Sequence, residues 1–163
     1  MSPYEIWTVI LQGAIIIIAT ATLVVYYRQL KVMTSQLSSM QSASQAQSTL
    51  TLVAFLQQQE VREHRTVVRE RLSKKAFTEW TSDERRSAAF VVANYDVAAA
   101  MIRAGVAPPA LIVENWGPSI VHCHEVLTPF IAEKRAEPGN TPRYWQNFDW
   151  LAQQARVGAL ALR

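Results

Sequence analysis

The sequence has very little cysteine and glycine, and it contains no strand-like alternation of apolar and polar residues over a useful length. The single cysteine, Cys123, excludes an internal disulfide and suits a reducing compartment. The five glycines are scattered singly, so no glycine-rich phosphate loop is present. These absences favour an all-α protein and exclude disulfide scaffolds and P-loop nucleotide-binding proteins.

Charged side chains are also absent from Ile6 to Tyr27, a segment with four consecutive isoleucines at its centre. As a helix this segment would be about 33 Å long, and the hydrocarbon core of a bilayer is about 30 Å thick. A cleaved signal peptide would start with basic residues, whereas this N-terminus carries Glu5 and no lysine or arginine. We therefore predict a transmembrane anchor over residues 1–28, rather than a signal peptide or a buried core helix.

Basic residues are missing before this span and begin directly after it, at Arg28 and Lys31. Because positive residues stay on the cytoplasmic side, we expect the N-terminus outside the inner (plasma) membrane and the C-terminal domain in the cytoplasm. All 16 lysines and arginines follow the span, which suits a protein surface close to anionic lipid.

The segment 29–49 is expected to be a helical stalk or a polar linker, because no charge occurs between Lys31 and Glu60. Apolar residues first recur at steps of 3, 4 and 3, as in a coiled-coil seam, at Leu30, Met33, Leu37 and Met40. A Ser/Gln-rich stretch then runs to Thr49, as a flexible linker or a frayed helix. Self-association and simple spacing are both open interpretations, because two heptads are too few to decide.

Residues 50–163 are expected to form a small cytoplasmic helical bundle. Strong helix formers run from Leu50 to about Lys75, and Thr81 with Glu84 forms a capping box for the next helix, which Gly105 ends. The apolar residues expected in the core are Leu52, Leu56, Val61, Val68 and Leu72, followed by Ala88, Val91, Val92, Tyr95, Ala98, Ala99 and Ile102.

Prolines divide the remaining sequence. Pro108 and Pro109 are expected to open a short helix that ends near Trp116, and Pro118 a second helix that Pro129 kinks or breaks. After the turn residues 137–140, the last helix is expected to begin near Pro142. It carries Tyr144, Trp145, Phe148, Leu151, Ala155 and Leu160.

The four residues from His122 to Glu125 form the only cluster with metal-binding or nucleophilic chemistry. On a helix His122 and His124 point in nearly opposite directions, and no second cysteine exists, so a zinc site is not expected. Adjacent His and Cys side chains do not face each other either. We therefore expect no catalytic, metal-binding or cofactor-binding residues, no cofactor and no enzyme activity.

Two groups of side chains are candidates for contacts with partners. Arg62, Arg65 and Arg69 recur on one helix face, which would be solvated, approach the inner leaflet, or bind an acidic partner. Nucleic acid is not an expected partner, because no aromatic stacking platform accompanies the arginines. The second group, which would either complete the core or form a protein interface, is Trp116, Trp145 and Trp150.

Five short segments between Phe90 and Arg156 carry a resemblance to a known family. They are Val92-Ala93-Asn94-Tyr95-Asp96, Ile102-Arg103-Ala104-Gly105-Val106, Trp116-Gly117-Pro118-Ser119-Ile120, Leu127-Thr128-Pro129-Phe130-Ile131 and Trp145-Gln146-Asn147-Phe148-Asp149-Trp150-Leu151. With these segments the stretch resembles a bacterial family of membrane-anchored helical proteins, catalogued as domain of unknown function 4760. The resemblance implies an N-terminal membrane span and a helical cytoplasmic domain, and it implies no activity.

Together these patterns predict a single-pass, membrane-tethered interaction module that serves as an adaptor or accessory subunit of a larger membrane protein complex. The expected partners are the lipid bilayer and another membrane protein or a second copy of the chain. The alternative is an oligomerising membrane effector or sensor that responds to a cytoplasmic signal.

Overall fold

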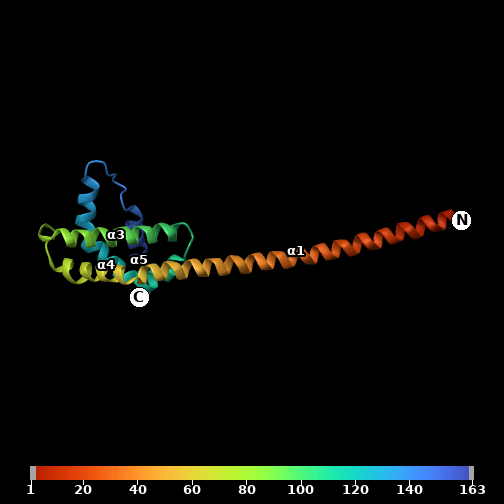
Figure 1. Cartoon of the computed structure of the whole chain (residues 1–163), viewed down its shortest axis with the longest axis horizontal. Coiled ribbons are helices and arrows are strands. Elements are labelled where there is room, and N and C mark those ends of the chain that lie inside the picture. The colour runs from red at the N-terminus through yellow and green to blue at the C-terminus, as the bar shows by residue number, and fades with distance from the viewer. Residues whose placement is uncertain (1–2, 162–163) are drawn as a thin grey trace. The chain divides into compact units, whose positions relative to one another are not determined.

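A computed structural model describes residues 3–161, in which helices and turns occur and no strand does, so the all-α prediction is confirmed (Figure 1). The chain divides into two compact units, residues 1–44 and 45–163. The elements are α1 (Pro3–Gln57), α2 (Gln59–Thr66), the π-helix η1 (Val67–Arg71), the 3₁₀-helices η2 (Leu72–Lys74) and η3 (Phe77–Glu79), α3 (Ser82–Arg103), α4 (Pro109–Ala136) and α5 (Gln146–Ala161).

The described residues of the first unit all belong to helix α1, and the large apolar side chains described there are exposed. The segment 29–49 is helical throughout, so of the two expected forms the structure has the helix. Five hydroxyls in this segment donate hydrogen bonds to carbonyls three or four residues earlier, as Ser42 does to Ser38 at 3.0 Å and Thr49 to Gln45 at 2.8 Å; the five donors are Thr34, Ser38, Ser39, Ser42 and Thr49. These bonds give the hydroxyls partners within α1, but bonds of this kind slightly destabilise a helix rather than stabilise it.

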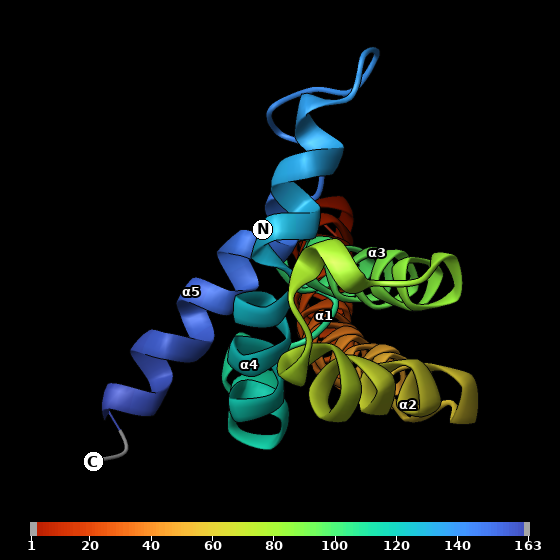
Figure 2. The same cartoon turned by 90° about the vertical axis from the view of Figure 1, so that its left-hand side faces the viewer.

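The second unit has an apolar core to which α1, η1, η2, α3, α4 and α5 all contribute. Helix α5 packs against α3 and α4, and α2 packs against α3 (Figure 2). All twelve apolar residues expected in the core between Leu52 and Ile102 are buried. Phe148, Leu151 and Ala155 of α5 are buried as well, whereas the side chain of Leu160 lies outside the described part.

Both ends of α3 follow the sequence signals. The Thr81 hydroxyl accepts from the Glu84 N–H, and the Glu84 carboxylate accepts from the Thr81 N–H at 2.9 Å, which completes the capping box. At the other end Gly105 has φ 81°, the Val106 N–H donates to the Met101 carbonyl, and the Gly105 N–H donates to the Ile102 carbonyl. This is a Schellman motif, which needs the left-handed conformation that glycine adopts without strain.

The region from Leu50 to Lys75 differs from the single helix expected. The helix breaks at Gln58, which has ψ 139°, and a π-helical turn follows α2. The buried residues explain the break, because Leu56 and Val61 are five residues apart, whereas a continuous helix aligns residues three or four apart. The extended residue reorients α2 so that Val61 is buried as well, although Val61 is not among the residues of the main core cluster.

The two helices expected on either side of Pro118 are a single helix, α4, which also continues through Pro129. Each internal proline costs about 3 kcal/mol in a helix. Both rings are on the exposed side, and an apolar stripe continues across both positions on the opposite side. The burial of this stripe offsets the cost. It comprises Ile112, Trp116, Ile120, Cys123, Leu127, Phe130 and Ile131.

The last helix begins at Gln146 instead of near Pro142. Residues 141–145 form turns in which Tyr144 N–H donates to the Thr141 carbonyl and Gln146 N–H donates to the Arg143 carbonyl. Trp145 has φ 59°, a left-handed conformation that ends the turns and that is unusual for a bulky residue. Packing holds it there, because its ring stacks on Phe130 with centroids 6.0 Å apart.

Candidate functional site

The three arginines expected on one lipid-facing surface do not lie equally exposed. Arg62 and Arg69 are exposed, but Arg65 is half-buried. The reason is its spacing, because Val61, Arg65 and Val68 follow each other at steps of four and three on the side of α2 and η1 that faces the core. The candidate basic surface is therefore Arg62 and Arg69, and the expectation that Arg65 shares it is corrected.

Arg65 reaches toward a group of polar side chains between α2, α3 and α4. Its Nη1 atom is buried and has no hydrogen-bond partner among the described residues.

Two buried groups lie near this arginine, and the first, the Tyr95 hydroxyl, lies 3.3 Å from Ser119 Oγ. Burial raises the pKa of Tyr95, and it raises the pKa of the Cys123 thiol to about 11, although Ser119 and the charges of Arg65 and Arg69 act in the opposite direction. Both groups are therefore protonated near neutral pH, and Cys123 is a small buried apolar residue rather than a nucleophile.

The two histidines beside Cys123 have different environments. His122 is exposed, whereas His124 is half-buried between α4 and α5. His124 Nε2 lies 3.0 Å from Asp149 Oδ1, and its Nδ1 lies 3.4 Å from Arg156 Nη2. A neutral ring that donates from Nε2 and accepts at Nδ1 satisfies both contacts. His124 therefore links the two helices, and the described residues contain no group of three or more His, Cys, Asp or Glu positioned to hold a metal.

The three tryptophans proposed as interface residues also differ in how deeply their side chains are buried. Trp116 is 8% exposed and belongs to the core, so it presents little surface to a partner. Trp145 and Trp150 are half-buried. Arg103 lies over the Trp150 ring at 5.7 Å and donates to Asn147 Oδ1 at 2.7 Å. The surface available for a protein contact is thus narrower than expected and lies around Trp145 and Trp150.

Sequence reasoning missed Asp96, which caps the N-terminus of a helix far away in the chain. Its Oδ1 accepts from the Phe148 N–H at 3.0 Å, and its Oδ2 accepts from Asn147 Nδ2 at 3.3 Å. Helix α5 needs this cap because Trp145, which precedes it, has no side-chain oxygen. A carboxylate in the middle of an otherwise apolar helix face was the available signal.

The segments that carry the family resemblance meet at this cap. Tyr95, next to Asp96, stacks on Phe148 with centroids 5.2 Å apart and planes 10° apart. Arg103, from the second segment, donates a hydrogen bond to Asn147 Oδ1. Ser119 of the third segment approaches the Tyr95 hydroxyl, and Phe130 of the fourth stacks on Trp145. The shared sequence pattern therefore describes how α3, α4 and the start of α5 are held together.

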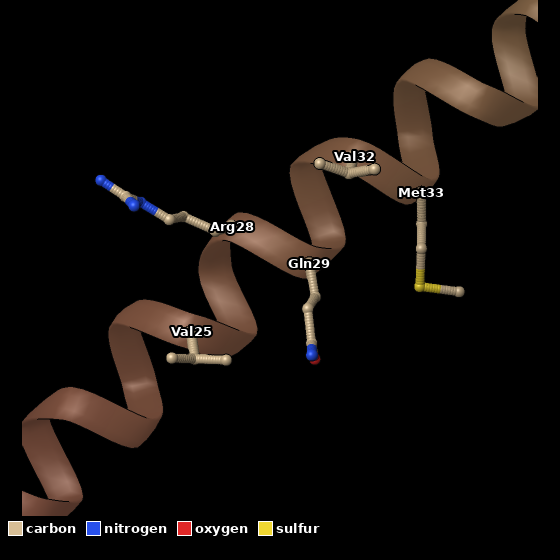
Figure 3. A pocket seen from close by; sticks show the side chains of 5 residues that line it. All are labelled: Val25, Arg28, Gln29, Val32 and Met33. Atoms are coloured by element: carbon tan, nitrogen blue, oxygen red, sulfur yellow. The ribbon is translucent and has the colours of Figure 1, made fainter.

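The basic residues expected at the membrane boundary, Arg28 and Lys31, are both exposed on α1. A shallow groove beside them is lined by Val25, Arg28, Gln29, Val32 and Met33, all from this one helix (Figure 3). Arg28 points away from the side that carries Gln29 and Met33. The groove is a strip of helix surface that nothing in the described structure covers.

The architecture defines a class of protein in which one long apolar helix precedes a small helical bundle. The sequence pattern of the family described as "Domain of unknown function (DUF4760)" matches residues 13–155, so the chain belongs to that family. The match extends well beyond the segments from Phe90 to Arg156 that suggested it. No curated protein and no solved structure matches the chain.

Proposed function

We propose that the chain is a single-pass membrane protein whose bundle acts in the cytoplasm as an interaction module, either an adaptor or an accessory subunit of a larger membrane complex. The N-terminus lies outside the inner membrane, and α1 crosses it. Tethering confines the bundle near the bilayer, so weak contacts act at a high effective concentration.

The observation that carries this proposal is the exposure of the apolar part of α1. None of its most apolar 18-residue window is buried. Ile15 to Ile18 are each more than half exposed. Burying such a side chain stabilises by about 1.5–3 kcal/mol, so these four residues alone would cost several kcal/mol in water. The same composition fits a signal sequence near the N-terminus, and the charge-free run from Ile6 to Tyr27, which is longer than the apolar region of a signal peptide, argues for a retained span.

Membrane integration and topology can be tested together on the full chain. Alkaline carbonate should leave the protein in the membrane pellet, and its mass should show an uncleaved N-terminus. Protease added outside spheroplasts should spare the bundle and digest it only after the cells are opened. Extraction by carbonate, cleavage after the span, or digestion in sealed spheroplasts would each refute the proposal.

The basic surface of Arg62 and Arg69 supports a second contact with the membrane. Both side chains are exposed, and neither forms an ion pair with a carboxylate of the described residues, whereas Lys75, Arg85 and Arg135 all do. Each basic residue near an anionic leaflet contributes about 1 kcal/mol. In the proposed role this surface holds the bundle close to the inner leaflet.

Hydrogen exchange of the full chain in nanodiscs tests this contact. In anionic nanodiscs residues 59–71 should exchange more slowly than in neutral ones, and Arg62→Glu with Arg69→Glu should remove the difference. The matched control, Arg86→Glu with Arg143→Glu, makes the same change in charge at exposed sites and should leave it intact. Equal exchange in both lipids would refute the lipid contact and leave the tether unaffected.

Co-purification from native membranes tests the adaptor role. A defined membrane protein should co-purify with the full chain, and exchanging the exposed Tyr144 and the half-buried Trp150 for alanine should reduce its yield. If the chain purifies only with itself, the alternative of an oligomerising effector or sensor is favoured. The periodic apolar surface of α1 is the observation that supports this alternative.

A further inference from the structure

We propose that two copies of this chain pair in parallel along one continuous seam of α1 that runs from Gln12 to Met40. This inference deepens the proposed function, because it depends on α1 crossing the membrane. The seam joins the apolar residues of the stalk to one polar residue inside the span.

The seam extends further than the stalk alone. Counting back from Leu30 in alternate steps of four and three gives positions without any charge, and these continue through the span. A repeat of this spacing keeps side chains on one face of paired helices. The positions are Gln12, Ile16, Ala19, Leu23, Tyr26, Leu30, Met33, Leu37 and Met40, and the next two, Ser44 and Gln47, end the apolar seam.

The part of the seam beyond the membrane boundary lacks a partner in the structure. Leu37 is 64% exposed and Met40 is 69% exposed, and Leu30 and Met33 are similarly open. The Ser- and Gln-rich helix around them has no charged pairs to stabilise it, and an isolated helix of this length is marginal in water. Packing against another helix would bury the four apolar side chains and would also stabilise the helix that carries them.

The charges favour an identical partner. Arg28 is turned about 160° around the helix from Leu30, and Lys31 about 100°, so neither basic residue faces the seam. Figure 3 shows Arg28 on the side away from Met33. No other charged residue occurs from Glu5 to Glu60. Two identical helices can therefore approach in parallel without placing like charges opposite each other, and insertion in the same direction makes them parallel.

Gln12 provides an independent reason for pairing with a second copy in register. It lies on the seam within the proposed span, and its side chain is exposed, so in a bilayer its amide needs a hydrogen-bond partner. An amide both donates and accepts, so two Gln12 side chains at the same depth can satisfy each other. Interhelical hydrogen bonds of this kind stabilise membrane helix pairs by roughly 0.6–2 kcal/mol. By contrast, the Thr20 and Thr22 hydroxyls already bond carbonyls within α1, at 2.8 Å each.

Disulfide scanning of the full chain in its own membranes tests the seam. Single cysteines at Met33, Leu37 and Met40 should form intermolecular disulfides on mild oxidation, because facing seam positions lie within the Cα distance that a disulfide spans. Cysteines at Ser35, Ser38 and Ser39, on the other sides of the helix, should react poorly. The chain without an introduced cysteine is the control, and it should form no intermolecular disulfide because Cys123 is buried. Each variant's bundle is checked by thermal unfolding.

The outcome distinguishes a failure of the proposed seam from a failure of the proposed membrane tether. Strong crosslinking at the seam positions alone supports the pair. Uniform, absent or opposite-face crosslinking in protein that resists carbonate extraction overturns the seam and leaves the membrane tether standing. Protein that carbonate extracts overturns both.

A second measurement addresses Gln12. In a detergent titration followed by energy transfer, Gln12→Leu should raise the dissociation constant of the pair roughly threefold to thirtyfold. The control Thr22→Val removes a polar group that already has a partner in its own helix, and it should leave the constant unchanged. An unchanged constant for Gln12→Leu, or an equal effect of both variants, would overturn the amide pairing.

Discussion

Residues 1–44 and 45–163 are both helical and rich in apolar side chains, but they use these side chains in opposite ways. In the second unit the large apolar residues converge on one core, and carboxylates partner several of the basic residues. In the first unit isoleucine, leucine and methionine remain exposed. The comparison shows that helical content alone says little about function, whereas the exposure of apolar side chains identifies the part that needs lipid or a partner.

The same contrast applies to charge. After Glu5 there is no acidic residue before Glu60, so α1 has no means of forming internal ion pairs, whereas the bundle contains both signs throughout. A charge-free helix is stable in lipid and against an uncharged partner helix. The bundle relies instead on burial and on capped helix ends, and each prediction below tests one side of this difference.

The largest expected difference is in thiol reactivity. Cys123 is fully buried, and burial raises its pKa from 9.0 to about 11, which lowers the thiolate fraction about a hundredfold. A cysteine introduced at the exposed Ser35 should react with maleimide at the rate of a free thiol. Cys123 should react at least about a thousandfold more slowly, because reaction also requires opening of the bundle. Rapid labelling of native Cys123 would contradict the buried position.

Truncation of apolar side chains should affect the two units very differently. Phe148→Ala removes a fully buried ring and should lower the free energy of unfolding by about 3–5 kcal/mol. Ile17→Ala, at a side chain that is 70% exposed, should change it by less than about 0.5 kcal/mol. Denaturation in mild detergent, followed by tryptophan fluorescence, measures both. Similar losses for the two variants would mean that the apolar N-terminal part of α1 contributes to the core.

The cap that Asp96 provides should have an intermediate effect. Asp96→Ala leaves the Phe148 N–H without its acceptor and should cost about 1–2 kcal/mol. Glu114→Ala, an exposed carboxylate on α4, is the control and should cost less than about 0.5 kcal/mol. Hydrogen exchange at the start of α5 should increase only in the Asp96 variant. Equal effects would indicate that the cap contributes nothing specific.

Local sequence rules predicted much of the bundle. The capping box at Thr81, the glycine stop at Gly105 and the buried stripe of α3 depend on residues within one or two turns of each other. Such interactions are encoded by spacing alone. The apolar residues of α1 and α2 were also identified correctly, although the break at Gln58 was not, because the core decides it.

The remaining features depend on contacts between distant residues. Asp96 caps α5 through the Phe148 N–H, 52 positions later in the chain, and its place on an apolar helix face indicates that it has a partner but not which one. Prolines 118 and 129 would end a helix by local rules, but tertiary burial keeps α4 continuous. Arg65 was assigned to an outer surface from the spacing of arginines alone, whereas the spacing of Val61, Val68 and Leu72 around it indicated an inward position. The candidate contact surface could therefore be predicted only in part.

Acid should weaken the bundle in a way that depends on Glu84. Its bonds to Lys75 at 2.7 Å and to the Thr81 N–H lower its pKa from 4.5 to about 2. Because the folded pKa is the lower one, its stabilising contribution is complete above pH 4.5 and is lost as the pH falls toward 2.

The variant Glu84→Gln tests this dependence. The variant should melt at a lower temperature than the wild type near pH 7, and the two melting curves should converge as the pH approaches 2. Circular dichroism between pH 7 and 2 measures this. A constant difference across that range would show that the ionisation of Glu84 makes no contribution.

The smallest effect is expected at two helical glycines, one in each unit. A Cβ at Gly117 would lie 3.7 Å from Val113 Cγ1 and 3.9 Å from the Ala155 Cβ, both ordinary contacts. Gly117→Ala should therefore change the stability of the bundle by less than about 1 kcal/mol, because the better helix propensity of alanine is opposed by contact between its Cβ and the ring of Pro118. A Cβ at Gly13 would meet nothing within 4 Å, so Gly13→Ala should leave the unfolding of the bundle unchanged. Destabilisation by much more than about 1 kcal/mol would mean that α4 and α5 approach more closely than these distances indicate.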